Sequence, residues 1–353
     1  MKRFYQKLNQ LLGGGENVVV ATIVHNAGSA PRSAGAKMIV QADGSLTGTV
    51  GGGRLEAETL ALAQQSHQSR QPWLQKFDLS GTDAAGTGMI CGGTGEIFID
   101  YIDAADASTR QVCKEILAAI ELKQKAWLIT SVIPEQAGVQ VKYLRQQCLV
   151  RHDGTIHGLF QCEPELMGKL AAGPAKISLH AEVLENRRFI VEPVRPASVV
   201  YLFGAGHVSQ QIARLTDMVG FQTVVIDDRP AFASQDRFPQ ADIMVIDNFA
   251  CLPALAVTPD SYLVIVTRGH LYDQTVLEQV LQTEAGYIGM IGSRRKRDLV
   301  FADLQAKGYK TADLQRVHAP IGIHIEAETP EEIAVSIVAE LIQVRAGREN
   351  EPA

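Results

Sequence analysis

The chain has 353 residues, of which 46% are hydrophobic and 20% are charged, a globular composition that excludes a disordered or fibrous protein. This length suggests two domains or one large one. With 33 basic and 39 acidic residues the formal net charge is -6, so no polycationic surface and no nucleic-acid partner are expected.

The N-terminal segment and the cysteines bear on the compartment. Phe4, Leu8, Leu11 and Leu12 recur at helical spacing, which predicts an amphipathic helix rather than a signal peptide. The 5 cysteines are scattered without a C-x-x-C pair, which argues against a disulfide framework and a tetrahedral zinc site. No apolar run approaches the roughly 20 residues that span a bilayer. We therefore expect a soluble cytoplasmic protein without a membrane partner.

The first half of the chain predicts a mixed α/β domain. Its expected elements are strands at residues 18–24, 37–40, 45–50 and 95–102 and helices at 54–67 and 109–123. Asp43-Gly44 predicts the turn of a hairpin. Three strand-like runs and a short helix are expected before Pro193. The two prolines of Glu192–Pro196 predict an interdomain linker, which bounds an N-terminal domain at 1–193 and a C-terminal domain at 198–348.

The second half alternates short apolar strands with helical segments. The strands are expected at residues 198–203, 223–226, 243–246, 262–266 and 287–291. Such nearly continuous apolar runs are typical of parallel strands that are covered on both faces, so a Rossmann-like doubly wound sheet is expected. Thr329, Pro330 and Glu332 predict the capped start of the last helix.

A dinucleotide fingerprint follows the first of these strands. Residues 203–209 read Phe-Gly-Ala-Gly-His-Val-Ser, which is a G-x-G-x-x-S pattern. Gly204 permits the tight turn, and Gly206 lets backbone amides approach a pyrophosphate at the start of a helix. Asp227 and Asp228 stand where a ribose-binding acid is expected. The pattern predicts a Rossmann fold, which either binds a nucleotide or serves only as a scaffold.

A basic segment follows the last predicted strand. Ser293 is expected to cap a helix, which places Arg294, Arg295, Lys296 and Arg297 near its first turn. Positive charge is unfavourable at that end of a helix. Either these residues form a solvated basic face, or an anionic ligand or partner offsets their charge.

A loop with Arg268 and His270 lies between another strand and a helix that Asp273 is expected to cap. Ligands of doubly wound folds bind at the carboxyl ends of the strands. This loop, the fingerprint and the basic segment are therefore expected to form one site.

Two glycine-containing loops in the first half could bind phosphate. Ser29 and Arg32 belong to a Gly-Ser-Ala-Pro-Arg segment after the first strand. The successive glycines Gly51, Gly52 and Gly53 can expose amide donors, and Arg32 or the following arginine, Arg54, can add charge. The alternative is a flexible turn beside surface arginines.

Cys91 lies beside Gly92 in a loop of small residues. A large ligand can approach such a cysteine, and its sulfur is a possible molybdenum or sulfur ligand. Most isolated cysteines are inert core residues, an alternative that suits Cys113 better because Cys113 lies within an apolar helical stripe.

These motifs in this order resemble the XdhC/CoxI accessory proteins. The shared segments are Gly28–Arg32, Gly51–Glu56, Met89–Gly93, Phe203–Val208, Thr267–His270, Gly292–Lys296 and Pro320–Ala334. The resemblance covers most of the chain and is weak between about residues 105 and 195. It departs at Arg54, where many members have a cysteine, which puts a mechanism with two cysteines in doubt.

The resemblance implies a maturation factor for molybdenum hydroxylases such as xanthine dehydrogenase. Such proteins bind the molybdenum–molybdopterin cofactor as transient cargo, protect it while its terminal sulfido ligand is installed, and deliver it to the apoenzyme. They are usually not counted as catalysts. The implied partners are the client hydroxylase, a cysteine desulfurase and a second copy of the chain in a homodimer.

Two other function classes remain open. An NAD(P)-dependent oxidoreductase would use the fingerprint, with His207 and His270 as acid–base candidates, although a histidine beside glycines is as often a structural donor. A nucleotide-sensing regulatory protein would carry no cofactor cargo. Pterin absorbance or fluorescence and metal analysis of the purified protein would separate a cofactor carrier from a dehydrogenase.

Overall fold

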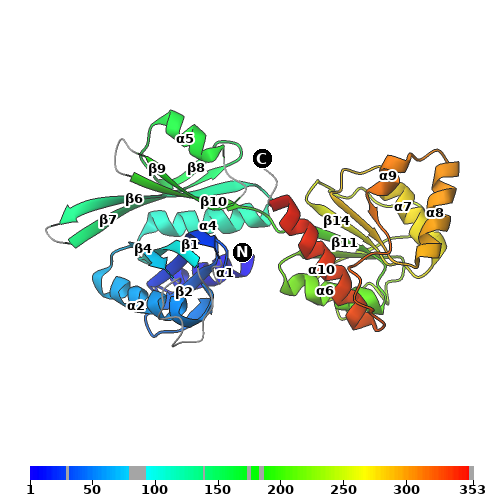
Figure 1. The fold of residues 1–353 in the computed structure, drawn as a ribbon, viewed down its shortest axis with the longest axis horizontal. Helices are drawn as coiled ribbons and strands as arrows, with labels where there is room; N and C mark the ends of the chain where they lie inside the picture. Colours follow the sequence, from blue (N-terminus) through cyan, green and yellow to red (C-terminus); the bar gives the residue numbers. More distant parts are fainter. Residues whose placement is uncertain (29–31, 79–92, 138–139, 173–175, 183–186, 350–353) are drawn as a thin grey trace. The chain divides into compact units, whose positions relative to one another are not determined.

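The computed structural model describes residues 1–28, 32–78, 93–137, 140–172, 176–182 and 187–349 of the chain (Figure 1). These residues form two compact units, one of Met1–Pro196 and one that begins at Ala197. Each unit has its own sheets and its own hydrophobic core.

The described part of the first unit contains two antiparallel five-stranded sheets, named here sheet A (order β3-β2-β1-β5-β4) and sheet B (order β8-β7-β6-β10-β9). The strands of sheet A are β1 (Val18–Gly28), β2 (Lys37–Gln41), β3 (Leu46–Gly48), β4 (Trp73–Asp78) and β5 (Gly93–Ile102). Those of sheet B are β6 (Ala126–Ala137), β7 (Gln140–Arg151), β8 (Ile156–Leu159), β9 (Ser178–Glu182) and β10 (Arg187–Val194). The helices are α1 (Lys2–Gly13), α2 (Gly53–Ser69), α4 (Ala107–Glu121) and α5 (Pro164–Ala171).

The local sequence patterns of this unit are confirmed where they are strong. Helix α1 buries Leu8, Leu11 and Leu12, so its apolar stripe faces the core as predicted. Strands β2 and β3 form the predicted hairpin, and the carboxylate of Asp43 in its turn accepts a hydrogen bond from the amide of Ser45 at 2.8 Å.

The middle of the first unit differs from the prediction. Between residue 123 and Pro193 the described residues form five strands and α5 instead of three strand-like runs and a helix, and β4 was not predicted either. Strands β4 and β9 each lie at the edge of a sheet and pair with a single neighbour. Edge strands are half exposed and carry polar residues, so their hydrophobic pattern is weak.

The predicted linker at Glu192–Pro196 is shorter than expected. Strand β10 continues through Val194, and Pro193 pairs with Trp127 of β6. On its other side the pairing with β9 stops at Val191, which lies opposite Ser178, the first residue of β9. Only residues 195–198 lack regular secondary structure there.

Ion pairs between buried or half-buried side chains link sheet A to sheet B. Each pair joins one residue of β2 or β5 to one residue of β7 or β10, so the charges lie between the sheets. The pairs are Lys37–Glu192, Asp100–Arg145 and Glu96–Arg188, each with a shortest nitrogen–oxygen distance of 2.7 Å.

The second unit is built on a parallel sheet, sheet C, with the strand order β13-β12-β11-β14-β15-β16. This order is that of a dinucleotide-binding Rossmann fold, and it confirms the predicted doubly wound sheet. The strands are β11 (Val199–Phe203), β12 (Gln222–Asp227), β13 (Asp242–Val245), β14 (Ser261–Ile265), β15 (Tyr287–Met290) and β16 (Val317–His318). The helices are α6 (His207–Met218), α7 (His270–Val280), α8 (Arg294–Ala306), α9 (Thr311–Gln315) and α10 (Pro330–Glu349).

Helices cover both faces of sheet C (Figure 1). Alternate residues of β11 point to opposite faces: Tyr201 packs into one core with residues of α7 and α8, and Leu202 packs into another with residues of α6 and α10. Strands β11, β14 and β15 are buried along their whole length, as expected of strands that are covered on both faces.

Helix α10 begins with the predicted cap. The side chain of Glu332 accepts from the amide of Thr329 at 3.1 Å, and the Thr329 hydroxyl accepts from the amide of Glu332 at 3.3 Å. This is a capping box. Among the described residues, no helix combines the length and apolarity needed to cross a bilayer.

Candidate functional site

Four polar loops meet at the carboxyl edge of sheet C. They follow β11, β12, β14 and β15, and parallel strands place such loops at the same edge. The loops contain the fingerprint, the two aspartates, the segment around Arg268, and the basic helix start. The expectation that these segments belong to one region is met by the topology.

The glycines of the fingerprint loop have different roles. Gly204 has φ +110°, and a Cβ there would clash with the carbonyl oxygen of Val266, so the turn itself requires glycine. At Gly206, the N-cap of α6, a Cβ would meet no atom within 4 Å. The positive end of α6 is therefore open at Gly206, and the exposed residue His207 begins the helix.

Asp227 lies beside this loop but is already hydrogen-bonded. Its side chain is buried, and one oxygen accepts from the amide of Ala205 at 2.7 Å. Both oxygens also accept from the Arg229 guanidinium, at 2.8 and 2.9 Å. Burial opposes ionisation, but the bonds from Arg229 and Ala205 outweigh it and hold the pKa of Asp227 below its usual value. The predicted ribose acceptor thus stabilises the glycine loop.

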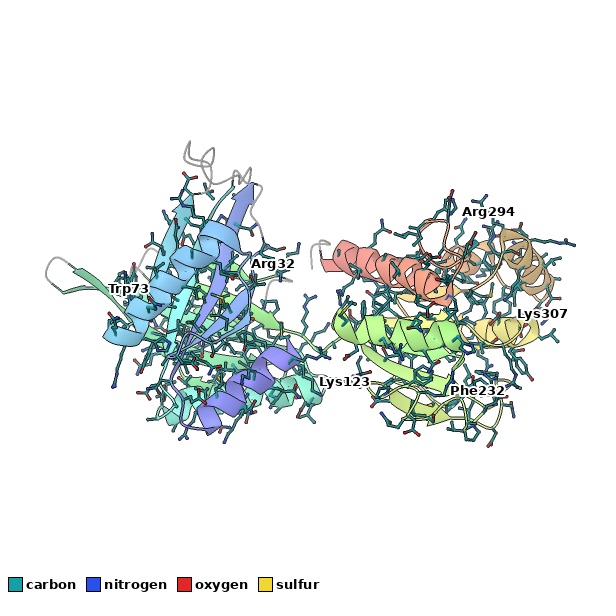
Figure 2. The ribbon with its side chains drawn as sticks, turned by 90° about the horizontal axis from the view of Figure 1, so that it is seen from below. Arg32, Trp73, Lys123, Phe232, Arg294 and Lys307 are labelled. Carbon is teal, nitrogen blue, oxygen red and sulfur yellow. The ribbon has the colours of Figure 1, made fainter. Side chains whose placement is uncertain are left out.

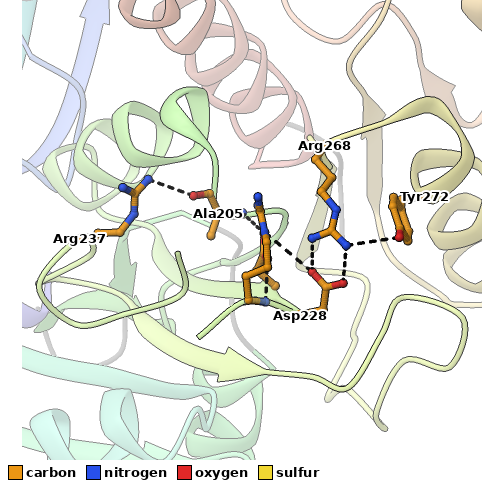
Figure 3. A network of polar contacts seen from close by, with 7 residues as sticks. Ala205, Asp228, Arg237, Arg268 and Tyr272 are labelled. Atoms are coloured by element: carbon orange, nitrogen blue, oxygen red, sulfur yellow. Dashed lines mark hydrogen bonds and ion pairs between the residues drawn. The ribbon is translucent and has the colours of Figure 1, made fainter. Parts of the chain in front are cut away.

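Asp228 is paired with Arg268 (Figure 3). Two parallel hydrogen bonds of 2.6 and 2.7 Å join the guanidinium to the carboxylate. Arg268 also lies over the ring of Tyr272, 4.7 Å from its centroid, and donates to its hydroxyl at 3.3 Å. Its bonds to Asp228 and Tyr272 raise the pKa of Arg268.

The basic helix start is partly neutralised inside the protein. Ser293 caps α8 as predicted and accepts from the amide of Lys296 at 3.2 Å. Lys296 is ion-paired with Asp273 and also donates to the carbonyl of Ile291 at 3.0 Å. Arg297 is ion-paired with Asp298 at 2.7 Å. Lys296 and Arg297 therefore already have acidic partners within the protein.

Arg294 and Arg295 differ from these two cations. Both side chains are exposed, and Figure 2 shows Arg294 at the surface of its unit. Within the described parts of the chain neither residue has an acidic partner. They are the cations of this helix start that remain available to an anion.

The loop that contains Arg268 is held by a buried carboxylate. Helix α7 begins at His270 with Gly269 as its N-cap, so Asp273 is not the cap that the sequence predicts. Asp273 turns back onto the loop and accepts from the amide and hydroxyl of Thr267, at 3.0 and 2.6 Å. The side chain of His270 lies outside the described part of the structure.

Sequence reasoning missed two arginines near the fingerprint. Arg237 donates to the carbonyl of Ala205 at 3.2 Å, and Arg229 stacks on Phe232 with 3.8 Å between its guanidinium carbon and the ring centroid. Arg237 lies 5.0 Å from the same centroid. The spacing of two arginines around one aromatic residue was the available signal.

The triple-glycine loop of the first unit does not present free amides as expected. The amide of Gly51 donates to Thr49 at 3.0 Å, and that of Gly52 donates to Glu56 at 3.2 Å. Arg54 is paired with Glu58 at 2.6 Å. The Thr49 hydroxyl and the Glu56 carboxylate thus accept the hydrogen bonds of these two amides, which the prediction assigned to a phosphate. Gly53 is the first residue of α2.

Three other candidates of the first unit, Ser29, Cys91 and Gly92, fall outside the described residues. The described residues Gly28 of β1 and Gly93 of β5 are register partners in sheet A. Arg32 is exposed (Figure 2).

Comparisons with known proteins relate both units to one family. Residues 200–341 match the family model described as the XdhC Rossmann domain, and residues 11–78 match that described as the XdhC and CoxI family. A crystal structure of a protein named as a xanthine dehydrogenase from Bacillus halodurans superposes with a TM-score of 0.78 and 28% identity. The superposition covers 98% of this chain and 97% of that one.

Three curated relatives are similar over most of this chain. The uncharacterized protein YqeB of Escherichia coli is 27% identical over 92% of the chain, which spans only 43% of that protein's length. A probable xanthine dehydrogenase subunit of Bacillus subtilis is 27% identical, with 98% of both chains covered. The molybdenum cofactor insertion chaperone PaoD of Escherichia coli is 22% identical over 97% of this chain and 88% of its own. With its Rossmann strand order, its fingerprint and these matches in both units, the chain belongs to the XdhC and CoxI family.

Proposed function

We propose that this chain is an accessory protein that binds the molybdenum–molybdopterin cofactor and delivers it to a molybdenum hydroxylase. Family membership supports the proposal, as does the similarity to a chaperone named for insertion of the molybdenum cofactor. Xanthine dehydrogenase is the client class that the names of two further relatives suggest.

The observation that carries the proposal is the open, cationic edge of sheet C. The start of α6 is uncovered at Gly206, and Arg294 and Arg295 are exposed without acidic partners in the described residues. Phosphate oxygens accept hydrogen bonds from helix-start amides and from guanidinium groups. A multiply anionic cofactor would therefore satisfy both features at once.

The proposal treats the cofactor as transient cargo that the protein shields while its terminal sulfido ligand is installed. A cysteine desulfurase as sulfur source and a homodimer as working assembly belong to the same proposal. In the first unit we assign Cys91 the contact with molybdenum or transferred sulfur, because a thiolate is a soft ligand. Arg32 is the exposed cation of the Gly-Ser-Ala-Pro-Arg motif of that unit.

An NAD(P)-dependent oxidoreductase is the second candidate, favoured by the fingerprint and the strand order. An enzyme that uses NAD would need an acidic group for the ribose hydroxyls, whereas one that uses NADP would need an arginine for the 2′-phosphate. Asp227 accepts hydrogen bonds from Ala205 and Arg229 instead, and Asp228 accepts from Arg268. These internal pairs weigh against a dinucleotide bound through either acid.

The test is the cofactor content of the full chain purified from cells that make the molybdenum cofactor, measured by pterin fluorescence and molybdenum analysis. Gly206→Val should fold, since a Cβ there meets nothing within 4 Å, and should lose the cofactor because the side chain covers the start of α6. Gly168→Val is the control, because Gly168 in α5 also has open space around its Cβ position. Wild-type protein without pterin or molybdenum, or a Gly206→Val variant that retains both, would contradict the proposal.

The assignment of Cys91 is tested by Cys91→Ser, which should lower molybdenum content and client activity without loss of stability. Cys113→Ser is the control. Cys113 is buried, and burial raises the pKa of its thiol to about 12, so it is not a thiolate. Its replacement should lower stability instead. A Cys91→Ser protein equal to wild type in both measures would make Cys91 a bystander.

A further inference from the structure

The ion pair between Asp228 and Arg268 crosses the end of the central strand of sheet C. Asp228 follows β12 and Arg268 follows β14, and β11 lies between these two strands. The pair, named here the Asp228–Arg268 bridge, therefore spans the carboxyl end of β11, where the fingerprint loop begins (Figure 3). In a doubly wound sheet this is the topological switch point, where ligands enter.

The bridge is less firmly built than the neighbouring Asp227–Arg229 pair. Asp227 is fully enclosed and also accepts from the backbone of Ala205. The Arg268 side chain is 34% exposed, and Asp228 has Arg229 as a second cation at 3.9 Å. If Arg268 is released, Asp228 keeps a positive neighbour, so separation of the bridge leaves no isolated buried carboxylate.

We propose that the bridge is exchangeable, and that a diphosphate group of the ligand replaces the Asp228 carboxylate on Arg268. A planar guanidinium binds phosphate and carboxylate with the same two-pronged geometry, so the ligand can take over both hydrogen bonds. Arg268 is then the anion-binding residue of the switch point, and Asp228 competes with the ligand. The ligand class is a diphosphate ester, either a nucleoside diphosphate or a pterin dinucleotide. This inference rests on the proposed function only in using the same edge of sheet C.

The exchange predicts the opposite result from a ribose-binding role for Asp228. Titration calorimetry of the full chain with inorganic pyrophosphate at low salt gives the first measurement. Asp228→Asn should bind pyrophosphate about fivefold more tightly, the equivalent of one partly exposed ion pair. A ribose-binding carboxylate would leave pyrophosphate affinity unchanged and would weaken ADP binding on the same substitution.

Three further variants control the result. Asp247→Asn removes an exposed acid after β13, and it should change affinity by less than about twofold, because screening limits the general charge effect. Arg268→Gln should weaken pyrophosphate binding by about tenfold or more. The double variant should bind as weakly as Arg268→Gln, since removal of the competitor has no effect without Arg268.

The inference is overturned if Asp228→Asn binds no better than Asp247→Asn, if Arg268→Gln binds like wild type, or if no form binds pyrophosphate. If Asp228→Asn does not fold, the affinity of Arg268→Gln for pyrophosphate decides alone, and a variant that binds like wild type overturns the inference. Preference for ADP over pyrophosphate would indicate that the site also contacts the nucleoside, equal affinity would indicate that it binds the diphosphate alone, and both support the exchange. If the purified chain lacks pterin but Asp228→Asn binds pyrophosphate more tightly, the cargo proposal is refuted and the exchangeable bridge is still supported.

Discussion

Carboxylate–cation pairs occur in both units, but in different settings. Between sheets A and B, Asp100 and Arg145 have side chains only 7% and 13% exposed. At the edge of sheet C, the side chain of Arg268 is 34% exposed, while that of its partner Asp228 is 11% exposed. The same chemistry can therefore serve packing in one unit and ligand exchange in the other, and the degree of burial decides which.

Burial matters because it sets the cost of losing a partner. A buried charge without its counterion has no water to solvate it, whereas a partly exposed one is rehydrated. Asp100 illustrates the cost, since burial raises its pKa even though Arg145 opposes that shift. The buried pairs between sheets A and B should therefore resist exchange, and the Asp228–Arg268 bridge should permit it.

The largest effect is expected for Arg145→Met. This substitution leaves Asp100 buried without its ion-pair partner and removes hydrogen bonds to Thr109 and Gln147. The free energy of unfolding should fall by about 3–5 kcal/mol, as measured by chemical denaturation. Lys169→Met, at the exposed pair with Glu165, should cost less than about 1 kcal/mol. Equal losses in the two variants would remove the distinction between buried and open pairs.

Lys296→Met should have the next largest effect. Asp273 is 1% exposed, and Lys296→Met removes its ion-pair partner, so the free energy of unfolding should fall by about 2 kcal/mol.

Arg294→Gln and Arg295→Gln should instead stabilise the empty protein by about 0.5 kcal/mol each, because they remove positive charge from the start of α8. Thermal unfolding of the three single variants checks the predicted loss of stability in Lys296→Met and the predicted gain in Arg294→Gln and Arg295→Gln. A Lys296→Met protein as stable as wild type would show that Asp273 does not depend on this cation.

A smaller, pH-dependent effect is expected for Glu340 on α10. Burial opposes its ionisation, but hydrogen bonds from His318, Tyr287 and the amide of Gly322 lower its pKa below the usual 4.5. A lowered folded-state pKa stabilises the protein above pH 4.5, and this contribution is lost as the pH falls through the folded value. Glu340→Gln should be about 1 kcal/mol less stable at pH 7 and should lose less stability on acidification.

Unfolding curves at neutral and acidic pH measure that difference, with Asp260→Asn as a control at an exposed acid. The interpretation fails if the stability of Glu340→Gln and wild type declines equally on acidification.

The smallest change in stability is expected for Asp228→Asn. Because the Asp228–Arg268 bridge is partly exposed, its loss should cost less than about 1 kcal/mol. A melting temperature close to that of wild type, measured by circular dichroism, would agree with an exchangeable pair. A loss as large as that of Arg145→Met would place the bridge with the buried pairs of the first unit.

Local signals were sufficient for much of the fold. The capping boxes, the hairpin turn and the fingerprint depend on residues within a few positions of one another, as with Thr329 and Glu332. The apolar strands of sheet C were also predictable, because strands covered on both faces need hydrophobic residues throughout. The edge strand β4 was missed because half-exposed strands carry little pattern.

The sequence by itself determined the Rossmann architecture, the family resemblance and the types of residue at the candidate site. Only the tertiary structure decided which charges are available to a ligand. Asp228 and Arg268 are 40 positions apart, and Asp273 and Lys296 are 23 apart, so no local pattern shows that they pair. Whether a cation is free depends on which carboxylate the fold brings within hydrogen-bonding distance, and the strand order of sheet C sets that distance.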